Sequence, residues 1–158
     1  MEIIIKKEQE RSIRQKQEMP NRLYNPEGMN FKKELRIKFV EFHDKFTRVD
    51  FVVYGSKKYT NGGWIQIDSS CYMESVDTGI KYTMLCPIKI PKAPKKFYFS
   101  KQGQRHEYSL LFPALPKTTK RVHIIEKDAP GNYFNFYNLD FASWMLVPHP
   151  SDLTLSNN

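Results

Sequence analysis

The sequence predicts an all-β protein, an antiparallel β-sandwich of about seven strands, and three observations indicate this fold. Apolar and polar residues alternate with a period of two in several short segments, as in strands with one buried face. The 11 Phe and 9 Tyr residues favour strands over helices. Turns rich in Gly, Pro, Asn and Asp separate these segments at intervals of about 8 to 15 residues, which is typical of a sandwich.

Residues 1–32 are predicted to form an N-terminal arm and a linker. The segment 7–18 is polar and favours a short helix, but Ile13 is its only apolar residue, so this helical arm has no apolar stripe with which to bind a core. Pro20 ends the helix, and the Asn, Pro and Gly residues that follow predict a linker. The β-sandwich domain is assigned to 33–141, and a C-terminal tail to 142–158.

Alternating apolar residues predict five strands in the first half of the domain. They lie at 35–39, 49–53, 64–67, 71–76 and 80–84. Turns rich in Gly and Asn separate several of these strands.

Prolines dominate the next segment of the chain. Pro87, Pro91 and Pro94 exclude a central strand, so 87–96 is expected to follow a surface or a sheet edge. Phe97 and Phe99 then alternate at period two and are expected to face the core.

The stretch LLFPALPKTTKRVHIIE, residues 110–126, predicts a corner between two core strands. The alternation of apolar residues places one strand at 108–112 and the next at 122–125. Four of these residues are expected to point into the sandwich: Leu110, Phe112, Val122 and Ile124. Pro113 and Pro116 stiffen the connection. A last strand is predicted at 133–139.

Four sequence blocks together resemble a known domain family. They are GGWIQIDSSCYMESVDTGIKYTM (62–84), KKFYFS (95–100), EYSLLFPALPKTTKRVHIIE (107–126) and NYFNFYNL (132–139). Their order is similar to that of a β-sandwich domain of Bacteroidetes envelope proteins, which often precedes a thioredoxin-like or other catalytic domain. The resemblance implies an immunoglobulin-like sandwich without chemistry of its own. We hypothesise a free-standing copy, for instance in a structural protein of a phage that infects such bacteria.

The charge of the chain is concentrated in one segment. The protein has a formal net charge of +8, and residues 89–121 alone contain nine Lys and Arg against one acid, Glu107. Such a segment attracts nucleic acid or another polyanion, although charge runs more often simply face water. Candidate contacts to an anionic partner are Lys95, Lys96, Lys101, Arg105, Lys117, Lys120 and Arg121.

The sequence contains no motif of catalysis or of metal binding. Histidines lie at positions 43, 106, 123 and 149, without the H-x-x-x-H or H-E-x-x-H spacing of zinc sites. His106 and His123 flank the corner, but a strand histidine is more often a packed or exposed side chain. No phosphate-binding glycine loop or nucleophile elbow occurs. The chain is therefore predicted to be no enzyme and to need no cofactor or metal.

Cysteine usage and hydropathy leave the compartment open. Cys71 and Cys86 either pair across neighbouring strands or remain free thiols. Ile3, Ile4 and Ile5 are followed at once by lysines, so no export signal is predicted. No apolar run of 18 residues occurs, so no membrane span is predicted. This favours a cytoplasmic or virion-associated protein, whereas the family resemblance implies the cell envelope.

The leading functional prediction is a structural or interaction module that acts through protein–protein contacts, in an envelope or a virion assembly. Its partners would be other protein subunits, including further copies of the same chain. Three apolar residues of the tail are candidates for docking: Trp144, Met145 and Leu146. The alternative is a basic β-domain that binds nucleic acid or another polyanion through 89–121.

Overall fold

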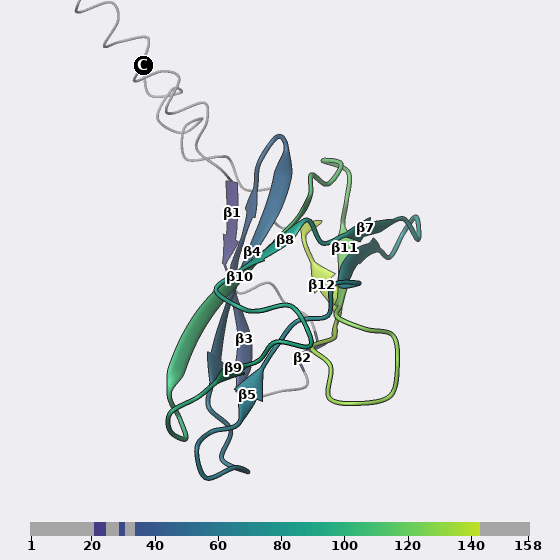
Figure 1. The fold of residues 1–158 in the computed structure, drawn as a ribbon. Coiled ribbons are helices and arrows are strands. Elements are labelled where there is room, and N and C mark those ends of the chain that lie inside the picture. Colours follow the sequence, from purple (N-terminus) through teal and green to yellow (C-terminus); the bar gives the residue numbers. More distant parts are fainter. Residues whose placement is uncertain (1–20, 25–28, 31–33, 143–158) are drawn as a thin grey trace, which may run out of the picture.

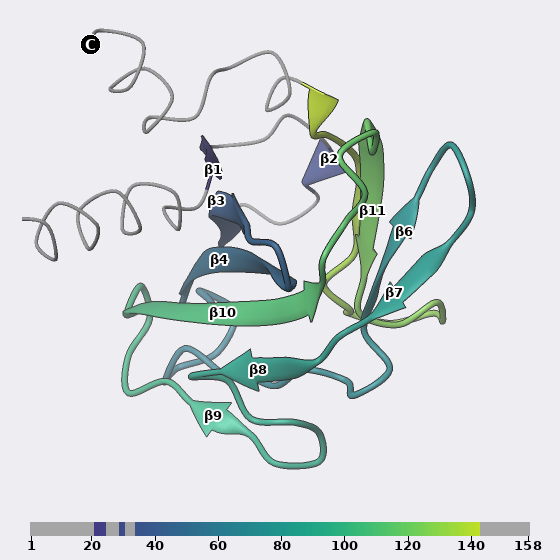
Figure 2. The same ribbon diagram turned by 90° about the horizontal axis from the view of Figure 1, so that it is seen from above.

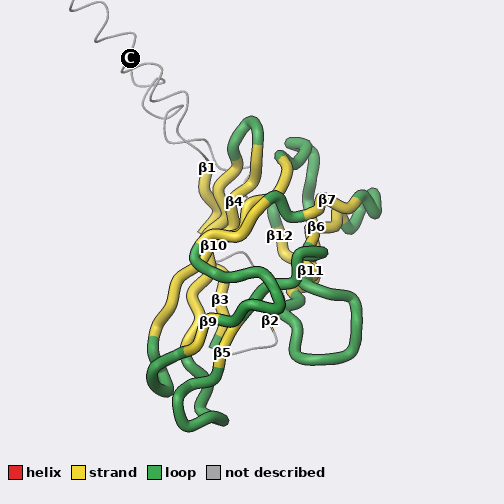
Figure 3. The backbone as a smooth tube through the Cα atoms, viewed as in Figure 1, coloured by secondary structure: helices red, strands yellow, loops and turns green. Residues whose placement is uncertain are grey.

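The chain folds into two antiparallel five-stranded sheets with a short two-stranded ribbon at one end, as the computed structural model shows (Figure 1). The structure describes residues 21–24, 29–30 and 34–142, and every element of these residues is a strand (Figure 3). The predicted all-β class is therefore confirmed. The predicted helical arm at 7–18 and the docking residues Trp144, Met145 and Leu146 lie outside the described residues.

The first sheet has the strand order β1-β3-β4-β10-β8. Its strands are β1 (Asn21–Tyr24), β3 (Leu35–Phe42), β4 (Phe46–Tyr54), β8 (Cys86–Ile88) and β10 (Arg105–Pro113). β10 pairs with β4 along its whole length, from Arg105 opposite Tyr54 to Pro113 opposite Phe46. Pro87 lies in the edge strand β8, which confirms the expectation that proline keeps this segment out of the sheet centre.

The second sheet has the order β2-β12-β11-β6-β7, and the ribbon consists of two further strands. The strands of the sheet are β2 (Met29–Asn30), β6 (Tyr72–Ser75), β7 (Lys81–Thr83), β11 (Arg121–Ile125) and β12 (Phe136–Asp140). The ribbon pairs β5 (Trp64–Ile65) with β9 (Phe97–Tyr98). The structure thus has twelve strands in its described part, where the sequence predicts about seven.

One part of the predicted linker is corrected by the structure. Residues 21–24 form β1, which pairs with β3, and residues 29–30 form β2, which pairs with β12. Composition predicts a linker because this segment contains Asn, Pro and Gly. The two short strands extend the sheets by backbone pairing, which needs no period-two apolar pattern.

The two sheets share one core between their inner faces (Figure 2). Val49 and Phe51 of β4 are buried from one side, and Val122 and Ile124 of β11 from the other. The rings of Phe51 and Phe136 meet across the core at 5.8 Å. Leu110 and Phe112 are also buried, so all four residues expected to point inward at the corner do so.

Polar side chains stabilise the fold at two places outside this core. On the outer face of the first sheet, Nε of Arg48 lies 2.7 Å from Oδ1 of Asp50, and the Ser109 hydroxyl donates to the same oxygen at 2.7 Å. At the end of β11, the buried Glu126 carboxylate accepts hydrogen bonds from the backbone N–H of Asp68 and of Phe134, at 2.9 and 2.8 Å. Glu126 thereby fixes two loops to the core.

Candidate functional site

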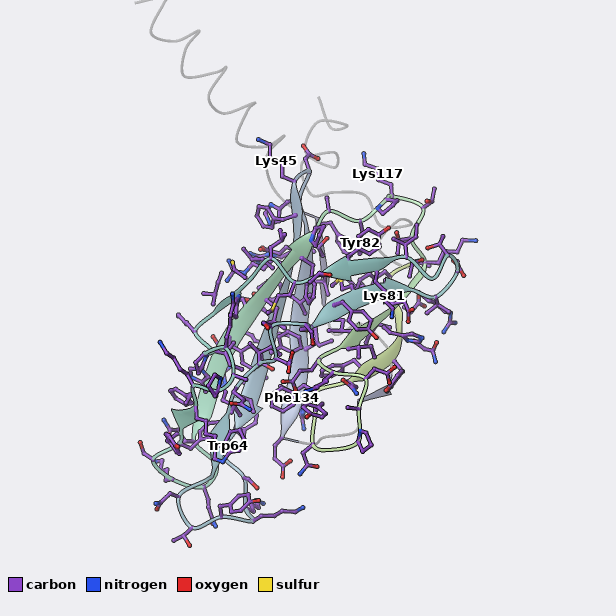
Figure 4. The ribbon with its side chains drawn as sticks, turned by 45° about the vertical axis from the view of Figure 1, so that its right-hand side comes forward. Lys45, Trp64, Lys81, Tyr82, Lys117 and Phe134 are labelled. Carbon is purple, nitrogen blue, oxygen red and sulfur yellow. The ribbon has the colours of Figure 1, made fainter. Side chains whose placement is uncertain are left out.

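The basic residues predicted to contact an anionic partner fall into two groups at opposite ends of the molecule. Lys95, Lys96, Lys101 and Arg105 lie around β9 and the start of β10, whereas Lys117, Lys120 and Arg121 lie at the corner beyond its end. The nine residues of β10 separate the groups by about 27 Å at the usual rise of a strand. Figure 4 shows Trp64 at one end and Lys117 at the other. The basic segment is therefore not one patch.

The β5–β9 ribbon has one apolar face and one exposed aromatic face. Ile65 pairs with Phe97, and these side chains pack into or against the core. Trp64 pairs with Tyr98, and both are exposed, by 46% and 67%. Because directly opposed residues of antiparallel strands point to the same side of a sheet, the indole and the phenol lie beside each other on the outer face.

The inner face holds the ribbon in place. The ring of Phe97 stacks on His106 with centroids 4.1 Å apart, and its edge meets the ring of Phe99 at 5.4 Å. Nε2 of His106 is hydrogen-bonded to the carbonyl of Lys89 at 2.6 Å. Phe97 and Phe99 thus face inward as expected, and His106 has a packing role.

Two loops flank the ribbon, and hydrogen bonds connect them. The Gln102 side-chain amide donates to the carbonyls of Lys57 and Tyr59 at 3.2 and 2.9 Å. Gly62 allows this approach: its φ is 88°, and a Cβ atom there would lie 2.6 Å from the carbonyl oxygen of Lys101. The ring of Tyr59, 60% exposed, lies against Gly63, the neighbour of Trp64.

Lysines are frequent in the two chain segments that carry these aromatic rings, and acidic residues are missing from these segments. The segments 55–67 and 92–104 contain no Asp or Glu. Their lysines are all exposed, and none forms an ion pair with a described residue: Lys57, Lys58, Lys92, Lys95, Lys96 and Lys101. Nζ of Lys96 lies over the ring of Trp64, 4.2 Å from its centroid. We call these six lysines together with Tyr59, Trp64 and Tyr98 the β5–β9 surface.

Arg105 differs from these lysines although it lies nearby. Its guanidinium contacts Glu107 at 2.7 Å, and Lys38 contacts the same carboxylate oxygen at 2.8 Å. The hydrogen bond from Lys38 and the charges of Lys38 and Arg105 hold the pKa of Glu107 below its usual value. The charge of Arg105 is therefore partly compensated.

The corner at the other end serves as a connection between the sheets. Its backbone is hydrogen-bonded to neighbouring segments: the carbonyl of Lys120 accepts from Phe141 at 2.7 Å, and that of Arg121 from Val76 at 3.0 Å. Leu115 packs against the core. Lys117, Lys120 and Arg121 remain exposed. Among the described residues the exposed large aromatic side chains all lie on the β5–β9 surface. The corner therefore has exposed positive charges but no exposed large aromatic ring.

Six residues of the β5–β9 surface are not among the candidate contacts predicted from the sequence. They are Lys57, Lys58, Tyr59, Trp64, Lys92 and Tyr98. The alternation around Phe97 contained a signal, since two inward rings place the residue between them outward. The pairing of β5 with β9 could not be inferred, because some thirty residues separate the two strands in the chain.

The two histidines that flank the corner in the sequence lie in different sheets. His106 lies on β10 in the first sheet and His123 on β11 in the second, where Nδ1 of His123 accepts from the N–H of Asn138 at 2.9 Å. No group of His, Cys, Asp and Glu that could hold a metal occurs within the described ranges. Cys71 and Cys86 are both free. Burial, followed by the charges of Glu126 and Asp68, raises the pKa of the Cys71 thiol far above its usual value.

Two further findings concern membrane-spanning helices and known relatives. Over residues 21–24, 29–30 and 34–142, no helix is long and apolar enough to cross a membrane. Comparison with protein-family models, with curated proteins and with solved structures gives no significant match.

Proposed function

We propose that this protein is a non-enzymatic binding domain that recognises an anionic partner through the β5–β9 surface. The observation that supports this most is that two segments without any acidic residue carry three exposed aromatic rings and six lysines, none of which forms an ion pair with a described residue. An immunoglobulin-like sandwich is part of the proposal, supported by two antiparallel five-stranded sheets with a common core.

Electrostatics favours an anionic partner at this place. At physiological ionic strength the Debye length is about 8 Å, so only charges close to one another act together. Lys57, Lys58 and Lys101 belong to two loops that Gln102 connects, and Lys92, Lys95 and Lys96 belong to the segment that leads into β9, so we expect the potentials of these lysines to add. Lys117 and Lys120 lie beyond the far end of the nine-residue strand β10, which spans about 27 Å or several Debye lengths, and they do not contribute to the same site.

Two carboxylates elsewhere in the described part are engaged in the fold, which supports a structural rather than a catalytic role for them. Asp50 is bonded to Arg48 and Ser109, and Glu126 to two backbone N–H groups. These carboxylates hold neighbouring strands and loops together.

The experiment is retention on immobilised heparin, a polyanion without bases, with elution by salt. We expect Lys57→Glu combined with Lys101→Glu to elute at clearly lower salt than the wild type. The matched control is Lys117→Glu combined with Lys120→Glu, which changes the net charge equally at the opposite end. Equal loss of retention in both double variants would contradict a specific surface.

A second candidate function is protein–protein contact, as the sequence also predicts, and an aliphatic group around the β6–β7 hairpin favours it. Val76 and Ile80 in the hairpin turn and Leu85 after β7 are exposed. We expect Val76→Ser with Ile80→Ser to abolish self-association or subunit binding seen by light scattering. An unchanged particle mass in the variant would contradict this function. Membership of an envelope or a virion assembly stays a prediction.

A further inference from the structure

We infer that the anionic partner of the β5–β9 surface is single-stranded nucleic acid, whose bases stack on Tyr98 and its neighbouring rings while its phosphates contact the lysines. The inference rests on the proposed function and specifies its ligand.

Tyr98 is the ring best placed to receive a base. It is exposed by 67%, more than any other large apolar side chain among the described residues. The neighbouring indole of Trp64 already has Nζ of Lys96 over its ring at 4.2 Å. Stacking of a base on an exposed aromatic ring is favourable for every base, because each has a π face.

The ribbon holds the backbone that carries this ring. Phe97, the chain neighbour of Tyr98, packs against both His106 and Phe99 on the inner face. The backbone N–H of Phe99 donates to the carbonyl of Gly63 at 2.9 Å. Because the backbone at Tyr98 is already ordered in this way, little backbone freedom is lost when a ligand binds.

The lysines lie on both sides of the rings along the chain. Lys57, Lys58 and Lys101 belong to the two loops joined by Gln102, and Lys92, Lys95 and Lys96 belong to the segment that leads into β9. A strand of nucleic acid that crosses the rings meets positive charge before and after them. This combination of a basic track and aromatic rings is typical of single-strand binding surfaces.

The rings favour a single strand over a duplex. In a duplex the base faces are covered by neighbouring base pairs, so an exposed tyrosine has no face on which to stack. Acidic glycans also bind to lysines and aromatic rings, so the test includes an acidic glycan as one of its probes.

The test measures binding of three probes at low salt by fluorescence anisotropy: labelled dT12, an abasic chain with the same sugar-phosphate backbone, and a heparin dodecasaccharide. We expect dT12 to bind at least about fivefold more tightly than the abasic chain, which corresponds to the lower limit for stacking of one base. Tyr98→Ala should lose at least about fivefold in affinity for dT12 and leave the abasic chain unaffected. Tyr98→Phe should restore the affinity.

Tyr133→Ala is the matched control, because Tyr133 is another tyrosine with a lysine, Lys127, over its ring at 5.6 Å, but lies in a different loop. It should bind dT12 as the wild type does. Equal affinity for dT12 and the abasic chain, or no effect of Tyr98→Ala, overturns the inference. If heparin still binds in that case, the proposed function stands without it. If none of the probes binds, both fail.

Discussion

Replacement of Glu126 tests the account of how the loops are fixed to the sandwich. The side chain is 4% exposed, and its two carboxylate oxygens accept from the backbone N–H groups of Phe134 and Asp68. A hydrogen bond to a charged group contributes about 1.5–3 kcal/mol. Glu126→Ala removes both bonds and should lower the free energy of unfolding by about 3–6 kcal/mol.

Glu126→Gln removes the negative charge of this side chain and keeps its size and shape. The glutamine keeps one acceptor oxygen, but its amide group faces the second N–H donor and cannot accept from it. We expect a loss of about 1.5–3 kcal/mol, the contribution of one such bond.

Urea unfolding at neutral pH, followed by far-UV circular dichroism, measures both losses. Glu107→Gln is the control, since Glu107 has a side chain 43% exposed and pairs with lysine and arginine at the surface. It should change stability much less. A loss below about 1 kcal/mol for Glu126→Ala, in a two-state transition, would refute the role assigned to these bonds.

Three further substitutions test other features of the structure. Gly62→Ala should destabilise the protein more than Gly79→Ala in the same urea assay. Both glycines have positive φ, which costs about 1–2 kcal/mol for alanine, but only at Gly62 would the new Cβ lie 2.6 Å from a backbone oxygen. Equal losses in the two variants would contradict this. The Asp68 carboxyl has a pKa below its usual 3.8, chiefly through the hydrogen bonds of Ser70, so its contribution to the free energy of unfolding is complete above pH 3.8 and is lost as the pH falls through the lowered pKa. Asp68→Asn should therefore flatten the decline of stability in acid, and an unchanged decline would exclude this contribution. The buried hydroxyl of Tyr108 has no hydrogen-bond partner among the described residues, so Tyr108→Phe should raise the free energy of unfolding by about 1 kcal/mol. A decrease of the same size would contradict this and would mean that the hydroxyl has a hydrogen-bond partner.

Strands that bury one face could be predicted from the sequence, because alternation depends only on neighbouring residues. The burial of Leu110, Phe112, Val122 and Ile124 follows from this pattern. The short strand β1 could not be predicted, because four residues are too few to show an alternating pattern and Asn, Pro and Gly follow them directly in the chain.

The candidate surface was predictable only in part. Lys95, Lys96 and Lys101 were found because charge is visible in composition. Trp64 was not found, because its exposure depends on the pairing of β5 with a strand distant in the chain. Nor could sequence alone show that Lys117 lies at the opposite end, since that separation arises from the direction of β10.

Lysine footprinting tests the central claim most directly. The protein is acetylated briefly with and without a heparin dodecasaccharide, and the modification of each lysine is measured by mass spectrometry. The account predicts protection of Lys57, Lys96 and Lys101, with Lys45 and Lys117 as reactive as in the free protein. Protection of Lys117 with no change at Lys96 and Lys101, or uniform protection of all lysines, would contradict it.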